Sequence, residues 1–264
     1  MKYKIGTMGS RKEIPITFSN ERGKELVGII HLPEKEKPPA VIICHGFQNH
    51  KTDNKFIRLA RALREVGILV FRFDFEGCGD SEGDPKQISV AREVSDLNSA
   101  YRALLKKCNI DPNRIAFVGA SLGAVVVSLV IERFKIPAKT LVFWSQAFNQ
   151  KELMKIWYTK EDLSQLNKKG YLVKGRKEIG KEYWLENKNK DYSIILSKID
   201  LPILLVHGKE DKDVPLEFSK TLAKKYKNVV LEVLPKADHK FEDFASQKKL
   251  IKLTLDWLKH HLSL

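Results

Sequence analysis

Apolar runs of strand length alternate with stretches of helical period along most of this chain of 264 residues. The runs predict strands over residues 40–44, 68–73, 115–119, 140–144, 202–207 and 229–234. Apolar positions three and four apart predict helices over residues 55–66, 88–107, 122–134, 216–226 and 242–262. A strand covered by helices on both faces is apolar throughout, as these runs are. The alternation therefore predicts an α/β fold with a mostly parallel sheet flanked by helices.

Two further strands are predicted before the alternation begins. Residues 13–18 and 25–32 are strand-like, and the polar turn at 19–23 between them is typical of a hairpin. The lysine- and proline-rich segment 35–39 then breaks regular structure. With this antiparallel pair the predicted sheet has eight strands, a size that one large domain of this length supports.

Residues 146–198 interrupt the rhythm between the sixth and seventh predicted strands. Many lysines occur there, and no stretch of the segment predicts a strand. Its tryptophans and tyrosines are Trp157, Tyr158, Tyr171, Tyr183, Trp184 and Tyr192. Because a long insertion in a compact domain is usually functional, we predict that residues 146–198 form a cap and that 1–145 and 199–264 form the core. A peripheral helical decoration is the alternative.

The chain is strongly basic, with 47 lysines and arginines against 33 aspartates and glutamates and a formal charge of +14. These lysines alternate with acidic residues along nearly every segment. A nucleic-acid surface more often combines a basic cluster with aromatic residues in a recognisable module. We therefore predict a solvated basic surface and no nucleic-acid partner, although the charge would favour anionic ligands by steering.

Features that the sequence lacks predict the cellular compartment of the protein and what its folding requires. The first eleven residues hold no apolar segment of signal-peptide length, and no stretch approaches the roughly 18 apolar residues of a membrane span. Cys44, Cys78 and Cys108 lie far apart, and no metal-ligand spacing joins them. These features predict a cytoplasmic protein with reduced thiols, no membrane span and no need of a metal or disulfides for folding.

The junction between the strand at 115–119 and the next helix carries the run Gly119-Ala120-Ser121-Leu122-Gly123, which fits the pattern G-x-S-x-G. In that pattern the serine occupies a sharp, strained turn, and its neighbours must lack bulk. The helix N-terminus adds partial positive charge where an oxyanion would form. Ser121 is therefore the predicted nucleophile, and a tight turn with an exposed serine is the alternative.

A serine nucleophile needs a basic partner, and His239 is the best candidate because it lies between the last predicted strand and the last helix. The other histidines are less suitable by position. His31 lies in an entry strand, and His45 and His207 each precede a glycine at a strand end. His50 lies in a loop of the wrong chain order, and His260 and His261 lie at the chain end.

The acid that orients the histidine should follow the seventh strand. The turn there offers Glu210, Asp211 and Asp213. These carboxylates could instead form a solvated turn that caps the helix beginning near Pro215, and different carboxylates could serve both roles. The order Ser121, Asp211, His239 matches the order serine, acid, histidine.

A second loop should help to stabilise an oxyanion. His45-Gly46-Phe47 follows the strand at 40–44 directly. The backbone N–H groups of Phe47 and Leu122 are the two predicted donors.

Together these motifs resemble the α/β-hydrolase superfamily over essentially the whole chain. The motifs are His45-Gly46-Phe47, the G-x-S-x-G run, Gly208-x-x-Asp211-x-x-Val214-Pro215 and Asp238-His239. The resemblance implies the α/β-hydrolase fold, and its Gly-x-x-Asp-x-x-Val pattern implies that the acid is Asp211 rather than Asp213. It implies no metal and no organic cofactor.

More narrowly, the chain resembles the bacterial cinnamoyl (feruloyl) esterase-like carboxylesterases. The residues that carry this likeness are 45–47 and the glycine-rich loop within 72–83. Those enzymes also carry their cap between strands six and seven, where this chain has residues 146–198.

On this resemblance we predict a serine carboxylesterase that hydrolyses short-chain or cinnamoyl esters through an acyl-enzyme. Acylglycerol lipases, thioesterases and serine peptidases use the same residues, and the fold does not choose among them. A non-catalytic binding protein on the same scaffold is a further alternative, but such proteins usually lose one of the three residues. The expected partner is a small-molecule ester, and a homodimer is left open.

Overall fold

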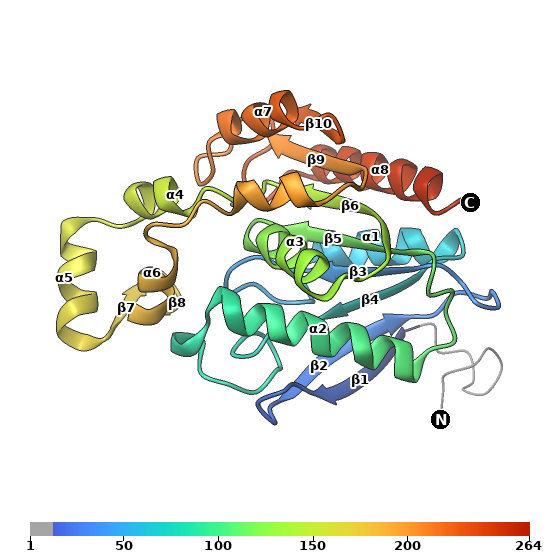
Figure 1. Cartoon of the computed structure of the whole chain (residues 1–264), viewed down its shortest axis with the longest axis horizontal. Helices are drawn as coiled ribbons and strands as arrows, with labels where there is room; N and C mark the ends of the chain where they lie inside the picture. The colour runs from blue at the N-terminus through green and yellow to red at the C-terminus, as the bar shows by residue number, and fades with distance from the viewer. Residues whose placement is uncertain (1–12) are drawn as a thin grey trace.

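A computed structural model describes residues 13–264, and its centre is one eight-stranded sheet (Figure 1). The strands are β1(Glu13–Ser19), β2(Glu25–His31), β3(Ala40–Cys44), β4(Leu69–Phe73), β5(Ile115–Ala120), β6(Ala138–Trp144), β9(Ile203–Gly208) and β10(Val229–Leu234). Across the sheet their order is β1-β2-β4-β3-β5-β6-β9-β10. β2 pairs antiparallel with β1 and β4, and the other pairs are parallel. The predicted eight-stranded, mostly parallel sheet is confirmed.

Helices cover both faces of the sheet. α1(Asn54–Glu65) and α8(Phe244–His261) pack on one face, and α2(Val90–Lys107) and α3(Leu122–Phe134) on the other (Figure 1). α7(Leu216–Lys225) packs beside β9 and β10. Successive side chains of a strand point to opposite faces, so in β5 Phe117 contributes to the core under α2 and α3, and Val118 to the core under α1 and α8. Burial on both sides explains why the strands are continuous apolar runs.

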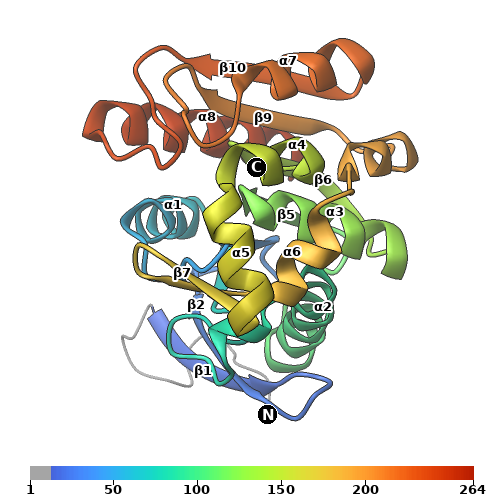
Figure 2. The ribbon, with the colours of Figure 1, turned by 90° about the vertical axis from the view of Figure 1, so that its left-hand side faces the viewer.

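Residues 146–198, called the insert below, lie between β6 and β9 and add no strand to the eight-stranded sheet. The insert contains α4(Gln150–Trp157), α5(Lys160–Lys169), β7(Tyr171–Lys174), β8(Lys177–Gly180), α6(Lys181–Asn187) and the 3-10 helix η2(Tyr192–Lys198). In Figure 2, α5, β7 and α6 lie in front of the core.

The prediction that the insert holds no strand is wrong. β7 and β8 form a two-stranded antiparallel sheet of their own. Each strand has only four residues, and most of their side chains are polar or exposed, so neither produces an apolar run. The turn between them includes Gly175 at φ 62°, a conformation that favours glycine.

Further expectations drawn from the sequence concern membrane spans, the cysteines and a leader segment. In residues 13–264 no helix is long and apolar enough to cross a membrane. Cys44, Cys78 and Cys108 are all buried, and no disulfide joins them. The expectation about a leader segment concerns the first eleven residues, which lie outside the described part of the chain.

Candidate active site

Ser121 stands at the sharp turn between β5 and α3. Its backbone has φ 51° and ψ −114°, a strained conformation for a residue that carries a side chain. A Cβ on Gly119 would lie 2.7 Å from the amide nitrogen of Ala124, and one on Gly123 would lie 2.5 Å from the carbonyl oxygen of Cys44. Real Cβ atoms do not approach backbone so closely, so packing around the turn requires both glycines of the G-x-S-x-G motif.

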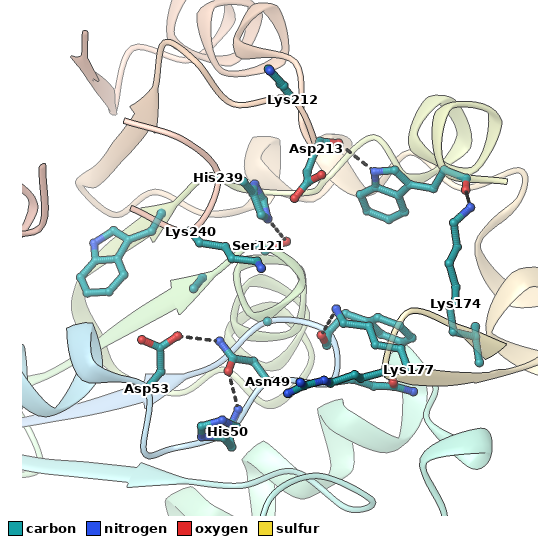
Figure 3. Close-up of a pocket in the computed structure, with 18 of the residues that line it drawn as sticks. Asn49, His50, Asp53, Ser121, Lys174, Lys177, Lys212, Asp213, His239 and Lys240 are labelled. Atoms are coloured by element: carbon teal, nitrogen blue, oxygen red, sulfur yellow. Dashed lines mark hydrogen bonds between the residues drawn. The ribbon is translucent and has the colours of Figure 1, made fainter. Parts of the chain in front are cut away.

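His239 lies in the loop between β10 and α8 and faces Ser121 (Figure 3). Its Nε2 is 3.2 Å from Ser121 Oγ, and its Nδ1 is 2.8 Å from Asp211 Oδ2. Because a carboxylate only accepts hydrogen bonds, Nδ1–H donates to Asp211 and Nε2 accepts from the serine hydroxyl. The His239 side chain keeps 17% of its surface exposed, so water and a substrate have access to it.

The Asp211 carboxylate is buried and fully engaged. Its Oδ1 accepts from the backbone amides of Asp213 at 2.9 Å and Val214 at 2.8 Å. Its Oδ2 is 3.1 Å from His207 Nε2 and 2.8 Å from His239 Nδ1. Burial raises the pKa of Asp211, but the hydrogen bonds from the two histidines and the backbone outweigh it and hold the pKa well below its ordinary value. Asp211 is therefore ionised at neutral pH.

His207 supports Asp211 from β9, a contact that the sequence analysis missed. Its Nε2 lies 3.0 Å from the Val214 carbonyl oxygen and 3.1 Å from Asp211 Oδ2, and its Nδ1 lies 2.7 Å from Ser219 Oγ. Both neighbours of Nε2 are acceptors, so Nε2 carries the proton and Nδ1 accepts from the Ser219 hydroxyl. The four-residue spacing between His207 and Asp211 was a signal that could have suggested this contact.

Gly208 allows the acid loop and the histidine loop to meet. A Cβ on Gly208 would lie 2.2 Å from the carbonyl oxygen of Ala237, which itself accepts a 3.0 Å hydrogen bond from the Glu210 amide. The loop after β9 is thus bound directly to the loop after β10, which carries His239. This contact explains how residues 28 positions apart come within hydrogen-bond distance.

The other candidate residues are not brought to this hydrogen-bond chain. Glu210 and Asp213 have exposed side chains, and within residues 13–264 neither carboxylate bonds to His239. In the same part of the chain, none of the alternative histidines hydrogen-bonds to Ser121; they are His31, His45, His50, His207, His260 and His261. His45 instead fixes the loop after β3: its Nδ1 bonds to the Gly46 carbonyl at 2.8 Å, and its Nε2 accepts from the Phe75 amide at 3.2 Å.

The two predicted oxyanion donors lie in segments next to Ser121. Leu122 is the first residue of α3, and Phe47 lies in the loop after β3. A Cβ on Gly46 would lie 3.1 Å from Ser121 Cβ, so this loop passes directly against the nucleophile. Among the described residues neither the Phe47 nor the Leu122 amide donates to a backbone group, which leaves both N–H groups available to a bound oxygen.

The insert holds the loop that carries Phe47. Lys177 Nζ donates to the Phe47 carbonyl oxygen at 2.9 Å, and the Tyr183 ring packs on the Phe47 ring with 4.3 Å between centroids. Gln48, the next residue, donates through its side-chain amide to the carbonyl oxygen of Glu178. Contacts from β8 and α6 therefore fix the backbone beside a predicted oxyanion donor.

A cavity of about 860 Å³ lies above Ser121 and His239, between the core and the insert. Its aromatic lining comes from Phe47, Trp144, Trp157, Tyr158, Tyr183 and Phe241. Trp157 also donates through Nε1 to the Asp213 carbonyl oxygen at 2.8 Å, which fastens the end of α4 to the acid loop (Figure 3). A cavity of this size and lining suits a small organic molecule.

The residues around this cavity supply the parts that acyl transfer needs. Ser121, His239 and Phe47 line one pocket, the ionised Asp211 orients His239, and the unengaged Leu122 amide directly follows Ser121 in the chain. Within residues 13–264 there is no group of three or more histidine, cysteine, aspartate or glutamate side chains placed to hold a metal ion.

Comparison with a protein-family model gives a match over residues 86–264, and the family is the prolyl oligopeptidase family. The match covers more than half of the chain and includes Ser121, Asp211 and His239. It also includes the insert.

Three similar proteins are each at most 29% identical to this chain in the aligned regions. An uncharacterized protein of Mycobacterium tuberculosis is 29% identical over 70% of this chain and 56% of its own length, so the chain spans just over half of that relative. The mitochondrial palmitoyl-protein thioesterase ABHD10 of Rattus norvegicus is 24% identical over 94% of this chain and 84% of its own. The structure of Est1E from Butyrivibrio proteoclasticus with ferulic acid bound has a TM-score of 0.83 at 21% identity, over 94% of this chain and 100% of that one. This last likeness shows the common fold.

Proposed function

This chain belongs to the prolyl oligopeptidase family of serine hydrolases, and from that premise we propose that it hydrolyses carboxylic esters of small acids through Ser121, His239 and Asp211. The observation that carries the proposal is the hydrogen-bond chain from Ser121 Oγ through the imidazole to the buried Asp211, at the base of a cavity of about 860 Å³. Such a chain on a strained strand-to-helix turn is the arrangement that activates a serine hydroxyl.

The proposed reaction proceeds in two halves. His239 Nε2 takes the proton of Ser121 as Oγ attacks the ester carbonyl carbon, and the imidazolium then gives that proton to the departing alcohol. Water next enters, loses a proton to His239 and attacks the acyl-enzyme, which releases the acid and restores the serine. Asp211 keeps the imidazole in the tautomer with its proton on Nδ1 and stabilises its charged form.

The amides of Phe47 and Leu122 are the proposed oxyanion donors. Each half of the reaction builds negative charge on the carbonyl oxygen, and fixed N–H groups stabilise that charge without reorganising. Support comes from the absence of competing backbone acceptors in the described part of the chain and from the insert, which holds the Phe47 backbone in place.

We also assign residues 146–198 the role of a cap. The insert supplies Trp157, Tyr158 and Tyr183 to the cavity wall, while the core supplies the reacting groups. Removing water from the reacting groups strengthens the electrostatic interactions between them and a substrate. The aromatic cavity wall supports the proposal that the substrate's acyl group is short or cinnamoyl-like. The Est1E structure with ferulic acid bound is consistent with this substrate class.

The test is hydrolysis of a p-nitrophenyl ester series and of methyl ferulate by the wild type and by Ser121→Ala. We expect the substitution to lower kcat by about 10³-fold or more and to leave the circular dichroism spectrum unchanged. The chain-length ranking, and the rate on methyl ferulate, would then separate general short-chain from cinnamoyl specificity.

A palmitoyl thioester and a short peptide amide are assayed beside the esters, because relatives include a thioesterase and the family is named for a peptidase. If the folded wild type cleaved only the thioester or only the peptide, the ester assignment would be overturned. Equal ester turnover by Ser121→Ala would overturn the assigned nucleophile.

A further inference from the structure

Cationic side chains outnumber anionic ones around the proposed active-site cavity. The lysines and arginine that line it are Lys55, Lys174, Arg176, Lys177, Lys212 and Lys240. The carboxylates in the same lining are those of Asp53 and Asp213. An excess of positive charge around a substrate cavity favours the binding of anionic ligands.

Three of the six cations are accounted for by other contacts or by position. Lys55 forms an ion pair with Asp53. Lys174 Nζ lies 2.6 Å from the Asp162 carboxylate and also donates to the Trp157 carbonyl oxygen. Lys212 lies at the outer edge of the cavity, well away from Ser121 in the view of Figure 3. Arg176, Lys177 and Lys240 are left.

Lys177 and Lys240 reach the cavity wall from different elements. Lys240 directly follows His239 in the chain, and Lys177 lies on β8 and donates to the Phe47 carbonyl oxygen at 2.9 Å. Figure 3 shows the Lys240 side chain beside Ser121 and Lys177 farther off, on the side of the cavity formed by the β7–β8 hairpin. Desolvation and the neighbouring Lys240 charge lower the pKa of Lys177, while Asp213 raises it, so the positive charges of Lys177 and Lys240 oppose each other across the cavity.

Local carboxylates neutralise these three cations only weakly. Lys240 Nζ lies 3.5 Å from Glu242, but both side chains are about two-thirds exposed, and such surface pairs contribute little. Arg176, at the turn of the β7–β8 hairpin, forms no ion pair with any residue from 13 to 264. Asp213 is the one remaining lining carboxylate, so the group keeps a net positive charge.

We propose that Arg176, Lys177 and Lys240 form a subsite for an anionic group, a carboxylate or a phosphate, carried by the ester substrate. This inference rests on the proposed ester hydrolase function and narrows its substrate class. The anion would relieve the repulsion between the two ammonium groups, and the guanidinium fork of Arg176 matches either oxyanion. The substrate would therefore be a half-ester of a dicarboxylic acid or a phosphorylated ester, with its charge held beside the scissile bond.

The first experiment compares esters of matched length that differ in charge. One pair is ethyl hydrogen adipate and ethyl hexanoate, and the other is 1-butyryl-glycerol 3-phosphate and 1-butyrylglycerol, with acid release followed by titration at constant pH. At low ionic strength we expect kcat/KM to be about tenfold higher for the charged member of at least one pair, which corresponds to about 1.4 kcal/mol. A preference in the first pair identifies a carboxylate, and one in the second pair a phosphate. The preference should shrink as salt is raised to about 0.5 M.

The second experiment changes the subsite. Arg176→Gln and Lys240→Gln should each lower the ratio of charged to neutral kcat/KM several-fold, and the double variant should bring it close to one. Lys249→Gln is the matched control, because Lys249 is exposed on α8 outside the cavity and its loss changes the net charge equally. Lys177 is left unchanged in this series because it also holds the Phe47 backbone.

A third measurement separates failure of this inference from failure of the proposed function. Adipate and inorganic phosphate are titrated calorimetrically into Ser121→Ala and into Ser121→Ala carrying both glutamine substitutions. Binding to the first protein and its loss in the second would support the subsite even if no ester were cleaved. Equal turnover of charged and neutral esters, with no anion binding, would overturn the subsite and leave the ester hydrolase standing.

Discussion

Ser121 and Asp211 are both held in unfavourable states: Ser121 has a strained backbone, and Asp211 carries a buried charge. The Ser121 backbone sits at φ 51° and ψ −114°, and conformations of this kind cost about 1–3 kcal/mol. Asp211 keeps a negative charge while buried, because two histidines and two amides bond to it. In both cases fixed neighbours offset the local cost, so reactivity depends on atoms beyond the reacting ones.

Asp211→Asn should lower kcat on esters by about 10³- to 10⁴-fold, because an amide would neither stabilise the imidazolium nor hold the Nδ1–H tautomer. Asp213→Asn is the matched control: its carboxylate is exposed, and the Asp213 amide that bonds to Asp211 remains in the variant. A greater loss in Asp213→Asn than in Asp211→Asn would show that the acid has been assigned to the wrong residue.

Asp211→Asn should also change how the stability of the folded protein depends on pH. An unfolded aspartate protonates near pH 4, whereas folded Asp211 protonates only at lower pH. Its carboxylate therefore stabilises the folded protein above about pH 4, and this contribution is lost as the pH falls through the folded pKa. In urea unfolding, Asp211→Asn should be less stable than the wild type by about 1–3 kcal/mol at pH 7. That gap should close progressively below pH 4, and a gap that widened there would contradict the assigned ionisation.

At the scale of elements, the short β7–β8 hairpin and α6 act on the loop after β3. Lys177 and Tyr183 contact Phe47, and Gln48 bonds to the Glu178 backbone. These segments are 130 or more residues apart in sequence. The insert therefore does more than cover the cavity, because it also fixes the backbone of a proposed oxyanion donor.

Tyr183→Leu should lower kcat on p-nitrophenyl acetate by about tenfold with a smaller change in KM, since small displacements of groups that act in the transition state are costly. Tyr183→Phe keeps the ring on Phe47 and should retain most of the rate. Tyr171→Leu, in the same insert but outside the cavity lining, is the control for general damage to the insert. Equal losses in Tyr183→Leu and Tyr183→Phe would assign the effect to the hydroxyl, which bonds to Gln150 at 3.3 Å, rather than to the ring.

At the scale of the whole molecule, apolar layers cover both faces of the sheet, and all three cysteines lie in the layer under α2 and α3. Cys44 is 0% exposed, Cys78 5% and Cys108 1%. Burial raises the pKa of the Cys44 and Cys78 thiols, which keeps them protonated and unreactive. Thiol accessibility therefore reports on the integrity of this layer.

A thiol reagent such as 5,5′-dithiobis(2-nitrobenzoate) should label none of the three cysteines at an appreciable rate in the native protein and all three in denaturant. Reaction should require opening of the core, so its rate should follow the unfolding equilibrium across a urea series. Fast labelling of one cysteine at neutral pH without denaturant would show that the layer around that residue opens locally.

Much of this molecule could be predicted from the sequence because its signals are local. Continuous apolar runs require strands buried on both faces, and the G-x-S-x-G run requires a turn too tight for side chains at Gly119 and Gly123. The choice of Asp211 among three neighbouring carboxylates came from the pattern shared with a family. The structure places that residue, and not Glu210 or Asp213, against His239.

Other features depend on contacts between segments far apart in the chain, which no local pattern records. The hairpin β7–β8 is too short and too polar to produce a strand signal, and it forms where the insert meets the loop after β3. The support of Asp211 by His207 and the presence of Arg176, Lys177 and Lys240 in one cavity wall likewise arise only when separate segments converge. The sequence by itself determined the sheet, the turn and the candidate chemistry, because these rest on local sterics and periodic burial. Only the tertiary structure decided which charges and rings surround that chemistry, because they come from different elements.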